Sequence, residues 1–379
     1  MNARVLQADP KNGFTQVVGV GGIGSGIVLA LQGNHTLGRN ESRPGQMLDA
    51  RDYCKLHIVE HYIAVLMGAG DVKGSFRVFA VGNIGSDQVG EALLQEMAEA
   101  GISVRYVHVE PRRSTLFSVC FLYPDQSGGN ITTSNSAACT LSKDQLEGCR
   151  GELGAAGTRG IALCLPEVPI EARRDFLRIA TDCRNYRVAS FLSGEMESVR
   201  ELELLSKVDL LALNHEEAAA MTGGCFTAPD RMQLLHACSE TAKAANPNIN
   251  LLVSAGADGA YVFEKDLWSH HKVTLVEAIS TAGAGDALLS GVISGLAAGL
   301  PLSERERSGS SNQGINTAID LGLTLASFSV TSPHTIHPAV DLESLLSFAR
   351  EKGVSLSGNL QDMPSYDFAT SVPDDSRIK

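Results

Sequence analysis

The sequence has few aromatic residues, no long apolar run and no excess of positive charge. Aromatic residues make up 5% of its 379 positions, and no segment reaches the roughly 18 consecutive apolar residues of a membrane-spanning helix. Residues 1–14 are polar and carry no apolar signal region, so we expect neither export nor a membrane partner. The formal net charge of -12 argues against a dedicated nucleic-acid binder, because a phosphate backbone selects clustered Lys and Arg.

Paired cysteines and two common kinase motifs are also absent. The eight cysteines stand singly, without a CxxC pair or the Cys/His spacing of a zinc site. We therefore expect reduced core cysteines in a cytoplasmic protein. The patterns GxxxxGK[ST] and HRDxxxxN do not occur, which excludes Walker A kinases and protein kinases.

The pattern of apolar residues predicts a large α/β domain. A hydrophobic fraction of 44% and a charged fraction of 20% are ordinary for a globular protein. From about residue 76 onward, short apolar runs alternate with segments of helical period, which indicates βαβ units and a doubly wound, mainly parallel sheet. One helix should begin at an N-cap at Ser86 and end near Gly101. Strands are expected at 77–81, 160–165, 187–192, 208–213 and 249–254.

Two stretches interrupt this alternation and predict a small β lid over the edge of the sheet. The first covers approximately residues 24–45 and begins with glycine-rich, polar sequence. The second covers approximately 108–135 and consists of extended segments that turn at 124–129. We expect one domain over 1–354 that includes both stretches, followed by a polar tail over 355–379 that is poorly ordered or lies on the surface.

Small residues in the segment 280–286 (Ser-Thr-Ala-Gly-Ala-Gly-Asp) lead directly into an apolar helix. The first turn of a helix leaves its amides without internal acceptors and carries partial positive charge. The N–H groups of Gly283, Ala284 and Gly285 can therefore hold a phosphate. Asp286 stands beside this anion hole and can take a proton from an attacking hydroxyl group. The alternative is a tight turn in which Asp286 only favours the helix dipole, worth about 0.3–1 kcal/mol.

The segment 280–286 resembles the DTxGAGD signature of the ribokinase-like (PfkB) sugar kinases, with Ser280 in place of the first aspartate. The resemblance covers approximately 77–326 and implies a three-layer α/β/α sandwich with a β lid. It also implies an enzyme that uses ATP and Mg²⁺ to phosphorylate a hydroxyl group of a sugar or sugar-like small molecule. Three further segments occur in the family's order, namely 81–87, 214–217 and 254–259.

The segments at 214–217 and 254–259 would bind the nucleotide in such a kinase. The resemblance assigns the phosphates and a water-bridged Mg²⁺ to Asn214 and Glu217. The alternative use is structural, because Asn214 can cap the next helix while Glu217 completes a capping box. The second segment follows an apolar strand, and a strand-ending turn would need the same glycines. The nucleotide-binding residues implied here are Ser254, Gly256, Gly259 and Thr281.

The substrate side departs from the family pattern. The family's first strand usually leads to a sugar-binding aspartate, whereas the strand at 17–20 leads into glycines, and the GGxGxN run of the next helix is missing. His57 and His61 share a helix face, which suggests a metal site, but no third ligand accompanies them. The candidates for binding the acceptor are Ser25, Arg39, Asn40, Arg43, Lys55 and Arg113.

Three other interpretations compete with a sugar kinase. A nucleoside kinase of the same fold would differ only in its acceptor. A GxGxxG motif at 19–24 suits an NAD-binding oxidoreductase, although glycines in 33–38 would break the helix that such a site needs. A catalytically silent binding protein would have no use for Asp286. We further expect a homodimer that forms through the lid.

Overall fold

The computed structural model describes residues 4–70, 75–125, 128–223, 231–304 and 314–356. Its centre is a nine-stranded sheet with the strand order β14-β13-β12-β11-β10-β9-β1-β5-β6. All pairings in this sheet are parallel except those of β13 with β12 and β14, which lie at one edge. The strands are β1 (Gln16–Val20), β5 (Arg77–Gly85), β6 (Ile102–Glu110), β9 (Gly160–Cys164), β10 (Tyr186–Ser190), β11 (Leu210–Leu213), β12 (Asn250–Ser254), β13 (Ala260–Glu264) and β14 (Leu267–His271).

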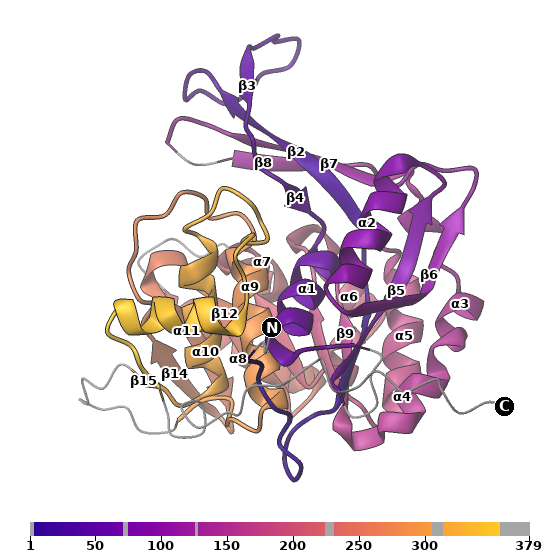
Figure 1. Ribbon diagram of the computed structural model, residues 1–379, viewed down its shortest axis with the longest axis vertical. Coiled ribbons are helices and arrows are strands. Elements are labelled where there is room, and N and C mark those ends of the chain that lie inside the picture. Colours follow the sequence, from indigo (N-terminus) through magenta and orange to yellow (C-terminus); the bar gives the residue numbers. More distant parts are fainter. Residues whose placement is uncertain (1–3, 71–74, 126–127, 224–230, 305–313, 357–379) are drawn as a thin grey trace, which may run out of the picture.

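Helices cover both faces of the sheet and make it the middle of three layers (Figure 1). Neighbouring residues of β1 show why both faces need a cover, because Val17 packs into one hydrophobic cluster and Val18 into the other. One cluster contains α1 (Lys55–Met67), α2 (Gln88–Glu99), α9 (Ala284–Ala297), α10 (Ala318–Ser329) and α11 (Leu342–Glu351). The other contains α3 (Lys143–Gly148), α4 (Arg150–Ala156), α5 (Ile170–Asp182), α6 (Met196–Glu201), α7 (His215–Thr222) and α8 (Arg231–Ala245).

A second sheet forms the lid, which stands above one end of the sandwich (Figure 1). In this sheet β2 pairs with β3, β4 and β7, and β7 pairs with β8. The predicted three-layer architecture and β lid are therefore confirmed. The lid strands are β2 (Gly24–Leu31), β3 (Gly45–Met47), β4 (Asp52–Tyr53), β7 (Leu116–Leu122) and β8 (Gly128–Thr132).

Several expected boundaries shift in the structure. The N-cap of α2 is Asp87 and not Ser86, because the Asp87 carboxylate accepts a hydrogen bond from Gly90 N at 2.9 Å. The strand β6 runs to Glu110 in the main sheet, so the second lid segment begins only after it. Ser355 and Leu356 form the short strand β16 against β15 (Gly314–Ile315). The rest of the predicted tail lies outside the described residues. None of the described helices combines the length and apolarity that crossing a bilayer requires.

The helix α1 packs directly on β1, and glycine makes this close approach possible. A Cβ atom at Gly19 would lie 2.8 Å from Leu56 Cδ1 and would also collide with the Glu60 carboxylate. Glu60 is fully buried, and burial raises the pKa of its carboxyl group well above the usual value. Because the Glu60 side chain is enclosed on all sides, it cannot swing into solvent to make room for a Cβ atom at position 19. The N-terminus of α1, where Lys55 stands, is positioned by this contact.

We expect Gly19→Ala to lower the free energy of unfolding by about 1–3 kcal/mol, because overpacking forces side chains and backbone apart. Chemical denaturation gives this value directly. Gly148→Ala in α3 is the matched control, since a Cβ there meets open space. Equal free energies of unfolding of the two variants would show that α1 can move away from β1 without loss of stability.

Candidate active site

The loop before α9 ends in a glycine that the geometry requires. Gly283 is the N-cap residue and has φ of 77°, in the left-handed region. A Cβ atom there would also lie 2.8 Å from the carbonyl oxygen of Thr335. Ala284, Gly285 and Asp286 are the first three residues of α9, and their N–H groups have no acceptor within the helix. The segment 280–286 therefore leads into a helix N-terminus, which is the local structure that an anion-binding turn needs.

The Asp286 side chain lies in a partly closed position beside this turn. Its exposed fraction is 17%, and burial is the main cause that raises its pKa above the usual value. The Lys55 ammonium group lowers the pKa of Asp286, and the nearby Asp52 carboxylate raises it further. The result is a carboxylate of increased basicity next to a group of hydrogen-bond donors.

Lys55 links two acidic residues that are far apart in the sequence. Its Nζ atom lies 3.9 Å from Glu217 Oε1 and 4.0 Å from Asp286 Oδ1. Burial acts to lower the pKa of Lys55, but four carboxylates, led by Asp286 and Glu217, together outweigh it, so the pKa lies above its usual value and the ammonium group is charged. Of the residues predicted to bind the acceptor, Lys55 is the one that the structure brings to Asp286.

Asn214 and Glu217 form a capping box at the start of α7, which the sequence analysis gave as the structural alternative to nucleotide binding. Glu217 N donates to Asn214 Oδ1 and Asn214 N donates to Glu217 Oε2, both at 2.8 Å. The other carboxylate oxygen, Oε1, faces Lys55. Burial is again the main cause that raises the pKa of Glu217, and Lys55 lowers it. One oxygen of Glu217 thus holds the helix, and the second is available to the cavity.

The segment 254–259 forms a tight turn between β12 and β13. Gly256 and Gly259 have φ of 57° and 93°, and a Cβ atom at Gly259 would collide with the carbonyl oxygen of His271. Ala255 N donates to Gly259 O at 2.8 Å and closes the turn. The two glycines therefore serve the tight turn that ends the strand, as the structural alternative predicted. Ser254, just before this turn, lines a cavity.

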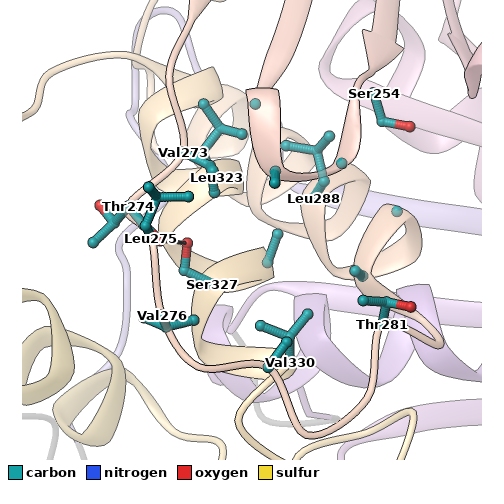
Figure 2. Close-up of a pocket in the computed structure, with 17 residues that line it drawn as sticks. Ser254, Val273, Thr274, Leu275, Val276, Thr281, Leu288, Leu323, Ser327 and Val330 are labelled. Atoms are coloured by element: carbon teal, nitrogen blue, oxygen red, sulfur yellow. Dashed lines mark hydrogen bonds between the residues drawn. The ribbon is translucent and has the colours of Figure 1, made fainter. Parts of the chain in front are cut away.

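Two neighbouring cavities meet at this turn. The first has a volume of about 310 Å³, and Figure 2 shows its largely apolar lining with the hydroxyl groups of Ser254 and Thr281 on one side. The second, of about 240 Å³, is lined by Lys55, Glu217 and Asp286. Ser254, Gly285 and Leu288 line both. The apolar cavity and the cavity with the acidic residues therefore adjoin at the first turn of α9.

The other predicted acceptor-binding residues lie away from this cluster. Arg43 donates from Nε to Glu41 Oε1 and from Nη1 to His35 O, both at 2.8 Å, within the same lid loop as Arg39 and Asn40. Arg113 donates to Asn135 O at 2.9 Å. Ser25 lines a separate cavity of about 340 Å³ between the lid and α2.

Two acidic residues of the site escaped the sequence analysis. Glu167 follows β9 and accepts a hydrogen bond from Lys55 N at 3.2 Å through Oε2. Burial raises the pKa of Glu167 to about 7, although Lys55 acts to lower it. Asp52, in β4 of the lid, is 6% exposed and lines the cavity between the lid and α2, and its charge raises the pKa of Asp286. The position of Glu167 just after a buried strand could have predicted a site residue, whereas no motif around Asp52 in the sequence marks it as one.

The GxGxxG segment and the paired histidines have structural uses. The element after β1 is the strand β2 and not a helix, so 19–24 lacks the helix N-terminus of a dinucleotide site. A Cβ atom at Gly22 would instead collide with Glu167. Burial lowers the pKa of His57 to about 3 and that of His61 to about 4, so both are neutral. Within the described ranges, no three potential ligands gather to hold a metal ion.

A model of the pfkB family carbohydrate kinases matches residues 63–342. The bifunctional protein HldE of Methylobacillus flagellatus is 26% identical over 226 residues, which are 58% of this chain and 44% of that protein. The 1-phosphofructokinase of Bacillus subtilis is 25% identical over 189 residues, 48% of this chain and 58% of that protein. The chain thus spans about half the length of the curated relatives it matches.

Solved structures share the fold at lower identity. The ribokinase of Arabidopsis thaliana, complexed with ribose and ATP, has a TM-score of 0.63 and 19% identity, and the match covers 88% of this chain and 98% of that one. The nucleoside kinase of Burkholderia thailandensis in complex with inosine has a TM-score of 0.65 and 14% identity, with coverage of 89% and 99%.

Proposed function

The chain belongs to the pfkB family of carbohydrate kinases, and on this premise we propose that it transfers the γ-phosphoryl group of ATP to a hydroxyl group of a sugar or sugar-like molecule. One observation carries the proposal. The Asp286 carboxylate lies in the first turn of α9 and lines the acidic cavity, next to Gly285, which lines both cavities. A proton acceptor and an anion-binding turn therefore share one helix start.

Asp286 acts as the general base in this proposal. As the acceptor hydroxyl group attacks phosphorus, its proton passes to the Asp286 carboxylate. The amides of Gly283, Ala284 and Gly285 donate to the oxygens of the phosphoryl group, where negative charge must be stabilised. Lys55, at 4.0 Å from Asp286 Oδ1, keeps the carboxylate ionised before the transfer.

The nucleotide fits the arrangement of the two cavities. The apolar cavity of about 310 Å³ suits a planar base, and a nucleotide bound there would have its phosphates near the start of α9, where the acidic cavity adjoins. Ser254 and Thr281 offer hydroxyl groups along this path, while the turn at Gly256 and Gly259 offers backbone groups. The likeness to a ribokinase complexed with ATP supports ATP as the phosphoryl donor.

Glu217 is the residue that would hold Mg²⁺ through water. Its Oε1 atom faces the acidic cavity while Oε2 is engaged in the capping box. Mg²⁺ usually keeps several water ligands and binds through one or two carboxylates plus substrate phosphates, which agrees with the lack of a complete ligand set among the described residues. When bound, the ion supplies positive charge that neutralises the phosphate oxygens.

The same proposal includes the chemical class of the acceptor and the cellular compartment of the protein. A nucleoside acceptor is the main alternative to a sugar, because a nucleoside kinase that binds inosine has the same fold. The intact Asp286 turn disfavours a silent binding protein. Seven described cysteines are free, which suits the reducing cytoplasm.

We also propose that the chain forms a homodimer through the lid. The strand registers place Ile27, Leu29, Val119 and Phe121 on one lid face together with Ile131. Ile131 is 65% exposed and Met47, on the same face, is 67% exposed. A second copy of this sheet would cover the apolar face and remove it from water.

We expect Asp286→Asn to reduce kcat by about 10²–10⁴, because a positioned general base contributes a factor of this size. ATP binding and the melting temperature should change little, since the amide preserves the size of the side chain. Steady-state ADP release and isothermal titration with ATP measure the two effects. Asp341→Asn, also at a helix N-terminus, is the control. If Asp286→Asn kept more than half of the wild-type kcat with chemistry rate-limiting, the residue would not be the base.

Glu217→Gln should leave stability nearly unchanged, because an amide oxygen can still accept the capping hydrogen bond from Asn214 N. Its activity should fall and then partly recover at high Mg²⁺ concentration. An Mg²⁺ titration of the initial rate checks this. Asn214→Ala is the stability comparison, with an expected loss of about 0.5–2 kcal/mol from the removed cap. Turnover equal to wild type at limiting Mg²⁺ would leave Glu217 with the capping role alone.

Ile131→Asp should convert the dimer to a monomer, because it places a charge on the apolar lid face that the second copy would cover. Sedimentation velocity at micromolar concentration measures the change. Val109→Asp, which alters a residue that is 53% exposed on β6 outside the lid, should leave the dimer intact. A wild-type protein that sediments as a monomer would contradict the proposed dimer without affecting the kinase assignment.

A further inference from the structure

The loop between α10 and α11 reaches the base of the lid and binds the backbone on both sides of Asp52. Thr335 N donates to Arg51 O at 3.1 Å, and Tyr53 N donates to Thr335 Oγ1, also at 3.1 Å. The Thr335 hydroxyl group itself donates to Arg51 O at 3.3 Å. Beside these contacts, Arg51 N donates to His334 Nδ1 at 2.9 Å. Two residues of this loop are therefore fastened to the lid strand β4 and to the residue before it.

The strand β4 is thus held at both of its edges. At one edge it pairs with β2, and Cys54 N, just past its end, donates to Gly24 O at 3.1 Å. At the other edge it binds Thr335, because the backbone groups of alternate residues in a strand point to opposite edges. Thr335 is 3% exposed, so little water competes for its hydrogen bonds. Since α1 begins directly after Cys54, the position of β4 sets the position of Lys55.

Thr335 also touches the turn that leads into Asp286. A Cβ atom at Gly283 would lie 2.8 Å from Thr335 O and 3.1 Å from Thr335 Cβ. The two backbones therefore pack with no space for a methyl group between them. Gly283 is the N-cap residue of α9, so its position sets the direction of the first helix amides and of Asp286. A shift of Thr335 would therefore move this turn.

Tyr62 of α1 anchors the same loop segment from a third side. Its hydroxyl group donates to Thr335 O at 3.3 Å and accepts from His337 N at 2.9 Å. Tyr62 is fully buried and lies about two helix turns after Lys55. The ring of His337 stacks on Phe328 at the end of α10, with 4.0 Å between the ring centroids. The segment is therefore fixed to α1 and α10 as well as to β4 and the turn before α9.

The two segments that meet at Thr335 carry charged groups of the site. Lys55 comes two residues after Tyr53, and Asp286 comes three residues after Gly283. The Lys55 ammonium group lies 4.0 Å from Asp286 Oδ1, although the two residues are far apart in the sequence. Their separation depends on how β4 and the start of α9 are placed relative to each other, and Thr335 contacts both. Thr335 lines none of the three cavities described above, so its effect on the reaction passes through these neighbours.

We propose that Thr335 is a positioning residue for phosphoryl transfer, because it couples the lid strand β4 to the turn at Gly283. The inference rests on the proposed kinase activity and adds to it a residue outside the cavities. The hydroxyl group of Thr335 makes the contact on the lid side, and its carbonyl oxygen makes the contact with the turn. A ligand that orders the turn therefore also orders β4, and a displacement of β4 disturbs the base.

Thr335→Val tests the hydroxyl group with a side chain of the same shape. Tyr53 N loses its acceptor, so kcat should fall about tenfold or more, with a smaller change in KM for ATP because Thr335 does not line the apolar cavity. Thr335→Ser keeps the hydroxyl group and should retain most of the wild-type rate. ADP release with ribose, fructose and inosine as acceptors measures these rates, and melting temperatures show whether each variant is folded.

Thr324→Val is the matched control. Thr324 is also buried, but its hydroxyl group donates to Asp320 O within α10, so the change should leave kcat near the wild-type value. A purely structural role of Thr335 would lower the melting temperature of Thr335→Val and leave the kcat of the folded variant unchanged, and that result would overturn the inference. A Thr335→Ser enzyme as slow as Thr335→Val would overturn it as well.

Hydrogen exchange tests the coupling without turnover, in the wild-type protein as well as in Thr335→Val. Saturating ADP should slow amide exchange of the wild type at 281–286 and also at 51–53, although 51–53 lines a different cavity. In Thr335→Val the first response should remain and the second should be lost. No response at 51–53 of the wild type, or an equal response in the variant, would overturn the inference and leave the kinase assignment standing. Failure of the wild type to bind ATP and ADP would overturn both.

Discussion

The arrangement of the site depends on the balance of charge around Lys55. Its ammonium group lies about equally far from Glu217 and Asp286, and its backbone amide donates to Glu167. These residues come from α7, α9 and the end of β9, so one lysine connects three elements that are remote in sequence. Partly buried carboxylates repel one another, and removing the shared cation would leave each with an unfavourable charge. The position of α1 therefore controls both the shape and the electrostatics of the cavity.

The parallel sheet explains why such distant segments meet. The strands β1, β9, β11 and β12 point the same way, so the residues that follow them collect at one edge of the sheet. Glu167, Asn214 and Ser254 occupy this edge because each comes at or just after a strand end. The helix α9 begins at the same edge, where Gly285 and Asp286 line the acidic cavity together with Ser254. The glycine at position 19 then lets α1 approach closely enough for Lys55 to reach them.

The sequence could predict those parts of the site that depend on local structure. The turn at Gly283, the capping box of Asn214 and the strands before them follow from neighbouring residues alone. Asp52 depends on lid pairing between β2, β4 and β7, which no local pattern reveals. The prediction also placed Arg43 at the substrate, because the sequence does not show that Glu41 and His35 already engage it. Charged residues in loops are therefore poor guides until their nearest partners are known.

The lid combines two opposite surfaces in the same few strands. Alternation along β2 places Gly26 on the face that carries Asp52 and places Ile27 on the apolar face. A shift of one residue in the pairing of β2 with β7 would bring apolar side chains of β7 onto the face that carries Asp52. The register is fixed at its base by the pairing of Ser25 with Tyr53, just before α1 begins. The short connection before Lys55 thus also determines which residues of β2 share a lid face with Asp52.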